Sequence, residues 1–115
     1  MDIENLTVGQ IREISKLAGG AGTKKVRSHS FVVGQQYLIR TVTMIQVGKL
    51  EAVTSSDLLL SGASWIADTG RFGACLATGV FFEVEKMPGD GLCIVGRGAI
   101  VDAFPWSHKL PEETK

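Results

Sequence analysis

The feature that most constrains the fold is an alternation of apolar and polar residues that changes phase at Gly48. Before this glycine the apolar positions are Ile45 and Val47, and after it they are Leu50 and Ala52. Because the side chains of a strand alternate between two faces, a change of phase within one strand indicates a bulge or a sharp bend. Small barrels need such a bend, whereas flat sheets do not. The pattern therefore predicts a mainly β domain built around one strongly bent strand.

Four further segments have the composition of strands and are separated by turn signals. Ser and Asp close the turn at 54–57, and a Pro-Gly-Asp-Gly turn begins at Pro88. We predict that these strands and the bent one form a five-stranded antiparallel barrel over residues 37–106. In chain order the four segments are residues 37–41, 58–66, 80–86 and 92–104.

The segment 92–104 is apolar on both faces, which is unusual in so small a domain. Leu92 and Ile94 share one face, and Cys93 and Val95 share the other. Such a strand has to be covered on both sides, and a second subunit is the simplest cover. In the preceding strand Phe81 falls on the face of the glutamates, a position typical of a subunit contact. The predicted interface residues are Phe81, Phe82, Val84, Cys93, Val95 and Val101.

The segments around the barrel are also marked in the sequence. Thr7 and Gln10 form a capping box, so we predict a helix over residues 6–18 that ends at the Gly19-Gly20 pair. Residues 19–36 are predicted to be a linker, either a solvated loop or an arm that contacts anions or RNA. Its cations are Lys24, Lys25 and Arg27. Residues 107–115 are predicted to be a polar tail.

A longer connection, residues 65–79, is predicted to carry a short helix between the third and fourth strands. The apolar side chains Phe72, Cys75 and Leu76 should face inward, and Asp68 is positioned to cap this helix. The sequence Asp68, Thr69 and Gly70 also resembles the active-site motif of dimeric aspartic proteases of the retroviral type. The second segment of such a protease would be residues 94–97, and the interval between the two is too short to hold the flap and the intervening strands. Capping is therefore the preferred interpretation, and no catalytic residue is expected.

The composition excludes several classes of function. The chain has 115 residues, the size of a single domain over residues 1–115, and 12 basic residues balance 12 acidic ones. A neutral chain lacks the overall field that attracts polyanions, so only a local patch could bind RNA. No run of residues resembles a signal peptide or a membrane span, which favours the cytoplasm.

The two cysteines and two histidines are not spaced as metal ligands. We therefore expect neither a metal nor a cofactor. Cys75 and Cys93 lie among apolar neighbours, which is typical of buried free thiols and less so of a single disulfide.

Two short patterns connect this organisation with a known family. A bend glycine is followed two residues later by an apolar residue in Gly48-Lys49-Leu50, ahead of the turn 54–57. Further on, Arg97-Gly98 is followed at intervals of three by Val101 and Phe104. With the order helix then five strands, this resembles the Sm-like superfamily, which includes the Sm, LSm and Hfq proteins. The resemblance covers roughly residues 6–104.

The resemblance implies a small bent barrel that assembles with copies of itself into a ring, in which the fourth strand of one subunit pairs with the fifth of the next. It also implies an RNA site at Arg97 and Gly98, with Ser56 and Asp57 nearby. The family's pocket asparagines are replaced here by Leu58 or Leu59 and by Ala99. Two functions therefore stay open, a structural scaffold and an RNA-binding ring.

Overall fold

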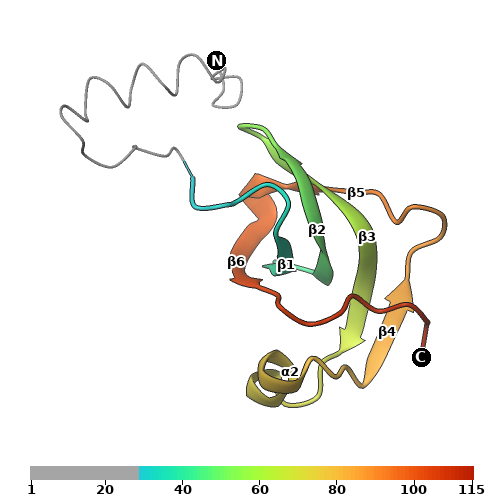
Figure 1. Ribbon diagram of the computed structural model, residues 1–115. Coiled ribbons are helices and arrows are strands. Elements are labelled where there is room, and N and C mark those ends of the chain that lie inside the picture. The colour runs from blue at the N-terminus through green and yellow to red at the C-terminus, as the bar shows by residue number, and fades with distance from the viewer. Residues whose placement is uncertain (1–28) are drawn as a thin grey trace.

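The computed structural model describes residues 29–115 as a mainly β structure in which six antiparallel strands form one sheet. The strand order is β4-β3-β2-β1-β6, and β5 also pairs with β3 (Figure 1). The predicted helix 6–18 and most of the predicted linker lie outside the described residues. The elements are β1 (Gln36–Thr41), β2 (Ile45–Val53), β3 (Asp57–Asp68), α2 (Phe72–Thr78), β4 (Glu83–Lys86), β5 (Cys93–Gly96), the 3-10 helix η1 (Arg97–Ala99) and β6 (Ile100–Pro105).

The bend expected at Gly48 is present as an interruption of the β2–β3 ladder. Val47 pairs with Ser64, but Lys49 pairs with Ser61, so the register shifts at the glycine between them. A side-chain carbon at Gly48 would lie 3.1 Å from the carbonyl oxygen of Ser61. Glycine therefore allows the two backbones to approach closely at the point where the ladder shifts register.

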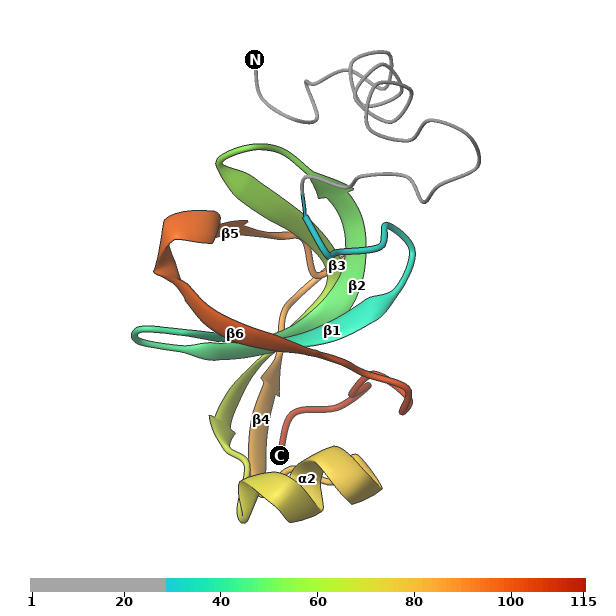
Figure 2. The same cartoon turned by 90° about the vertical axis from the view of Figure 1, so that its left-hand side faces the viewer.

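Strand β3 is long enough to pair with two different strands along the same edge. Its first residues pair with β5, with Leu59 opposite Ile94, and its last residues pair with β4, with Ile66 opposite Val84. Between these two ladders, the amide of Ala63 donates to the carbonyl of Gly91 at 3.0 Å. The strand is thereby shared between two parts of a strongly curved sheet (Figure 2).

The predicted last strand, residues 92–104, is in fact two strands separated by η1. Strand β5 pairs with β3, whereas β6 pairs with β1 at the other end of the strand order. The Gly96-Arg97-Gly98 sequence forms the turn that carries the chain across. The prediction of one continuous strand was wrong because the apolar pattern gives no sign of a change of partner.

Two hydrophobic cores lie on opposite faces of the sheet. In β1 the neighbours Leu38 and Ile39 are both fully buried, and each belongs to a different core. The first core contains Tyr37, Ile39, Leu50, Val53, Leu58, Leu60, Ala63 and Val95. The second contains Leu38, Val47, Ile66, Cys75, Phe81, Val84 and Trp106.

The second core exists because two segments cover that face of the sheet. One is α2, which contributes buried Cys75 and the half-buried Phe72 and Leu76, so its predicted inward face is confirmed. The other is residues 106–115, which we call the C-terminal strap. Trp106 begins the strap and stacks on Phe81, with ring centres 5.1 Å apart and planes at 8°. The predicted polar tail therefore packs against the sheet (Figure 1).

Strand β4 is shorter than the predicted segment 80–86, and this reverses two side chains. The strand begins only at Glu83, and Phe82 lies in a bend ahead of it, so the alternation of β4 does not extend to Phe81 and Phe82. Phe81, predicted on the face of the glutamates, is 3% exposed, whereas Phe82 is 65% exposed. The acidic side chains Glu83 and Glu85 are exposed as expected.

Candidate functional site

Arg97 is held against the turn between β2 and β3, near Ser56 and Asp57 as the resemblance implies. Its amide donates to the carbonyl of Ser56 at 2.9 Å, and its Nη1 donates to the carbonyl of Thr54 at 2.6 Å. The bond to Thr54 joins residues 43 positions apart. Four of the predicted site residues, Arg97, Gly98, Ser56 and Asp57, are therefore brought together.

The turn itself is held by Thr54. Its Oγ1 accepts hydrogen bonds from the amides of Ser56 and Asp57 at 3.1 and 2.9 Å, and lies 2.9 Å from Oδ1 of Asp57. The polar groups of Ser56 and Asp57 are thus used largely to stabilise the turn. Gly98 is exposed, and a side-chain carbon there would meet nothing within 4 Å. Within this cluster Arg97 is the residue best placed to contact a ligand.

Arg97 also lines a groove with a volume of about 500 Å³ that the sequence did not indicate. The groove is also lined by Phe31, ahead of β1, and by Tyr37, within β1, whose rings meet edge to face at 5.4 Å. His29 lies at the same groove, with its ring centre 6.2 Å from that of Phe31. The groove therefore combines aromatic surface with a cation.

Asp102 lines this groove too, but its charge is balanced by Arg40. Arg40 Nε donates to Oδ1 of Asp102 at 2.7 Å, and Nη2 donates to the other carboxylate oxygen. These hydrogen bonds hold the pKa of Asp102 below its ordinary value and raise the pKa of Arg40. In the described part of the chain Arg97 has no acidic partner of its own. The groove consequently favours an anion over a cation.

The three linker cations Lys24, Lys25 and Arg27 lie outside the described residues. They are close to the groove in the sequence, since Arg27 is two residues ahead of His29, which lines it.

The predicted interface residues divide into three groups by exposure. Phe82 and Val101 are exposed, at 65% and 62%. Cys93 is half-buried. The residues Phe81, Val84 and Val95 are buried in the two cores of a single chain, so they offer little surface to a neighbour.

The apolar surface of the last segment lies on the face that was left out of that set. Leu92 and Ile94 are 63% and 70% exposed, while Val95 on the other face is buried. Ile94 stands opposite the half-buried Leu59 in the β3–β5 ladder. The signal was in the sequence, because the alternation placed Leu92 and Ile94 together, but it did not say which face points outward.

Two strand edges are open next to this surface. Within residues 29–115, β5 pairs only with β3 and β6 pairs only with β1. An edge without a partner strand presents unpaired backbone donors and acceptors. The outer face of β5 thus combines exposed apolar side chains with a free edge.

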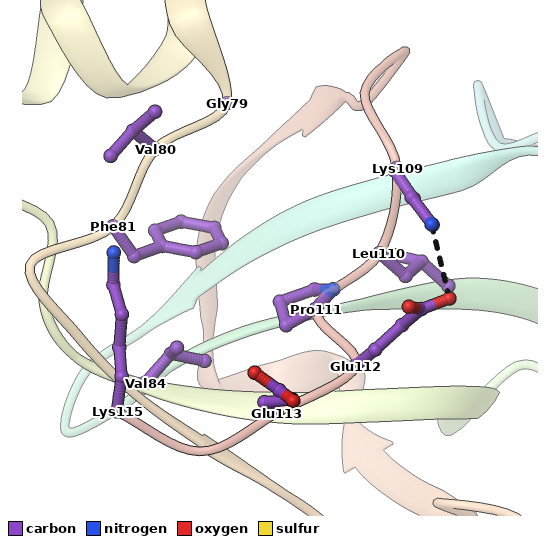
Figure 3. Close-up of a pocket in the computed structure, with 10 residues that line it drawn as sticks. All are labelled: Gly79, Val80, Phe81, Val84, Lys109, Leu110, Pro111, Glu112, Glu113 and Lys115. Atoms are coloured by element: carbon purple, nitrogen blue, oxygen red, sulfur yellow. Dashed lines mark ion pairs between the residues drawn. The ribbon is translucent and has the colours of Figure 1, made fainter.

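A second groove, of about 490 Å³, lies between the strap and the chain that leads into β4 (Figure 3). Its apolar surface includes Phe81, Val84 and Leu110. At its rim Lys109 and Glu112 form an ion pair at 3.3 Å, drawn as the dashed line in Figure 3.

Asp68 does not cap α2, contrary to the prediction. The N-cap position is Arg71, and it makes no side-chain capping bond. Instead Oδ1 of Asp68 accepts a hydrogen bond from the amide of Gly70 at 2.8 Å, which closes the turn ahead of the helix.

The two cysteines are free thiols and form no disulfide. Burial raises the pKa of both Cys75 and Cys93, so neither is favoured as a thiolate nucleophile. No cluster of metal-ligating side chains occurs among the residues that the structure describes. In that same part of the chain, no helix has the length and apolar character needed to span a membrane.

Comparison with known proteins adds no relative: no family model, no curated protein and no solved structure matches this chain.

Proposed function

We propose that this chain is an assembly module, a divergent Sm-like barrel that joins copies of itself into a ring and serves as a structural scaffold. The observation that carries the proposal is the outer face of β5. Leu92 and Ile94 are exposed there beside an edge that has no partner strand within residues 29–115.

The topology supports a head-to-tail contact between subunits. The open edges of β5 and β6 belong to different parts of the sheet. When β5 of one copy pairs with β6 of the next, the first copy keeps a free β6 edge and the second keeps a free β5 edge. Such a contact repeats until the ring closes, and closure removes the free edges. Val101, exposed on β6, would then add apolar area to the contact.

The Sm-like interpretation draws on the positions of its two motifs. Gly48 lies at the bend of β2, and Arg97-Gly98 forms the crossing between β5 and β6. The crossing is fixed by Arg97 to the turn 54–57, which follows the bent strand in the chain.

Native mass spectrometry of the full chain and of Ile94→Asp tests this proposal. We expect the full chain to give a closed species of roughly five to seven subunits and Ile94→Asp to be monomeric, because a buried charge without a partner opposes the contact. Val80→Asp is the matched control, since Val80 is also exposed, at 53%, but lies ahead of β4. A monomeric full chain at high concentration would contradict the proposal.

RNA binding is a second candidate function, favoured by the groove at Arg97. A guanidinium without an acidic partner within residues 29–115 lies at the same groove as the half-buried ring of Phe31. Single-stranded nucleic acids are bound by such pairs of features, a cation for the phosphate and an aromatic ring for the base. The basic residues Lys24, Lys25 and Arg27 would add phosphate contacts.

Titration with labelled oligo-U and oligo-A at two salt concentrations tests the RNA proposal. We expect an affinity that falls with salt and that weakens about tenfold or more in Arg97→Ala, since each phosphate contact contributes to the salt dependence. The control Lys49→Ala removes an equal charge from an exposed position on β2. Absence of binding at low salt, or equal losses in both variants, would exclude this function.

A further inference from the structure

The outer edge of β4 is occupied by the chain's own C-terminal strap. The amide of Val84 donates to the carbonyl of Lys115, and the amide of Lys115 donates back to Val84, both at 2.9 Å. The amide of Lys86 donates to Oγ1 of Thr114 at 3.1 Å. Because the amide of Met87 faces β3 instead, at 3.1 Å from the carbonyl of Ala63, alternate amides of β4 serve the sheet and the strap.

The strap is anchored firmly at one end and weakly at the other. Trp106 is 3% exposed, and His108 Nε2 lies 2.8 Å from the carbonyl of Leu76 at the end of α2. Every residue from Glu112 onward is exposed, and the second groove remains open between this part of the strap and the chain entering β4 (Figure 3). The last residues are thus held by the hydrogen bonds to β4 and by no buried side chain.

The charges of β4 oppose one way of filling this edge. Glu83 and Glu85 are both exposed on β4, on either side of Val84. Two copies of β4 would bring these glutamates together, which opposes direct pairing of one β4 with another. Lys115 of the strap avoids them, because it pairs with Val84 through backbone hydrogen bonds and its side chain lines the second groove with Val84 (Figure 3).

We propose that the β4 edge is a docking site for the strap of a second copy, so that two copies can exchange their C-terminal segments. An exchanged strap makes the same hydrogen bonds to β4 as the chain's own strap does in one copy. Because the strap's last residues bury no side chain, only their hydrogen bonds to β4 have to break before the strap can bind a second copy. This contact uses neither β5 nor β6, and it extends the proposed function by a second, separate interface.

Mixing two variants tests the exchange. The acceptor is the chain ended after Pro111, which leaves the β4 edge open. The donor is the full chain with Lys86→Pro, which removes one amide that holds the strap in place and leaves the β3 ladder intact. Both carry Ile94→Asp to remove the β5 contact. We expect native mass spectrometry to show each variant alone as a monomer and the mixture as a heterodimer, identified by its mass.

Two matched controls locate the contact. An acceptor that also carries Lys86→Pro should form several-fold less heterodimer, because its edge lacks a donor. A donor ended after Glu113 should lose the heterodimer as well, because it lacks Thr114 and Lys115, the residues that bond to β4. Circular dichroism confirms that each variant is folded. A mixture that stays monomeric, or a donor ended after Glu113 that pairs equally well, would overturn strap exchange and leave the β5 proposal untouched.

Discussion

Two apolar faces of the sheet differ in whether the chain covers them. The face over Leu38, Val47 and Ile66 is covered by α2 and the C-terminal strap, and its side chains form a complete second core. The outer face of β5 has Leu92 and Ile94, equally apolar, and both are exposed within the described part of the chain. Apolar sequence alone therefore does not make a core. A core also requires a segment long enough to reach across the face.

The segments that cover the second core come from two stretches outside the strands of the sheet. The connection that contains α2 supplies Cys75, and the strap supplies Trp106. Neither stretch extends to β5, which lies at the other end of β3. The difference between the two faces explains why we propose assembly at β5 and a displaceable cover at β4.

The largest expected effect is loss of the cover itself. Trp106→Ala removes the ring that stacks on Phe81 and should lower the free energy of unfolding by about 3–5 kcal/mol, as for other large buried aromatic residues. Urea unfolding followed by circular dichroism measures it. Trp65→Ala is the comparison, because Trp65 is only half-buried and should cost clearly less. Equal losses would mean that the covered face contributes no more than the rest of the surface.

The next effect concerns the bend that creates the first core. Gly48→Ala places a carbon 3.1–3.2 Å from three atoms of β3, and the overpacking should cost about 1–3 kcal/mol of stability. Thermal unfolding with Gly96→Ala as control is suitable, since a side-chain carbon at Gly96 has nothing within 4 Å. A Gly48→Ala variant as stable as the control would show that β2 and β3 can separate at the bend without cost.

The Arg40–Asp102 pair links the sheet to α2, because the Arg40 guanidinium lies 4.5 Å from the Phe72 ring centre. Arg40 lowers the pKa of Asp102 through their hydrogen bonds, so the folded state holds the carboxylate charged to lower pH than the unfolded state does. The pair's stabilisation is complete above the unfolded carboxyl pKa of about 4 and is lost as pH falls through the lower folded value.

Urea unfolding of the full chain and of Asp102→Asn as a function of pH therefore gives curves that converge in acid. We expect the full chain to be the more stable at neutral pH, by less than the Gly48 effect because both partners are partly exposed. A difference that is independent of pH would contradict an electrostatic role for this pair.

A small gain is expected within the cover. Gly73→Ala lies in α2, where a side-chain carbon meets nothing within 4 Å, so the helix should be stabilised by about 0.4–1 kcal/mol. Thermal unfolding measures this shift. The same change at Gly79 is the opposing control: its φ is 76°, and a side-chain carbon would lie 2.5 Å from the His108 ring.

The smallest effect on stability is expected on the bare face. Ile94→Asp changes a side chain that is 70% exposed, so the monomer's free energy of unfolding should change by no more than about 0.5 kcal/mol. By contrast, we expect the same substitution to abolish assembly. Unfolding at high dilution separates the two quantities. A large loss of stability in the dilute monomer would indicate that Ile94 is covered within a single chain.

Much of the local structure could be predicted from the sequence. Residue patterns indicated three elements correctly: strand β1, the bend at Gly48 within β2, and the short helix α2 after β3. The resemblance implied that Ser56 and Asp57 lie near Arg97, and the structure shows Arg97 bonded to the turn that contains them. Phe81 was assigned to the face of the glutamates, but it is buried because β4 begins only at Glu83 and the alternation that the sequence shows as continuous does not extend to it.

The sequence by itself determined which segments are extended, where the chain turns, and which side chains alternate. Only the tertiary structure decided which apolar face is covered, that the last apolar run changes partner at Arg97, and that the strap lies along β4. The physical reason is that alternation follows from the geometry of a single strand, whereas burial depends on a second segment. Whether that segment reaches a given face depends on the path of the whole chain, which no local pattern records.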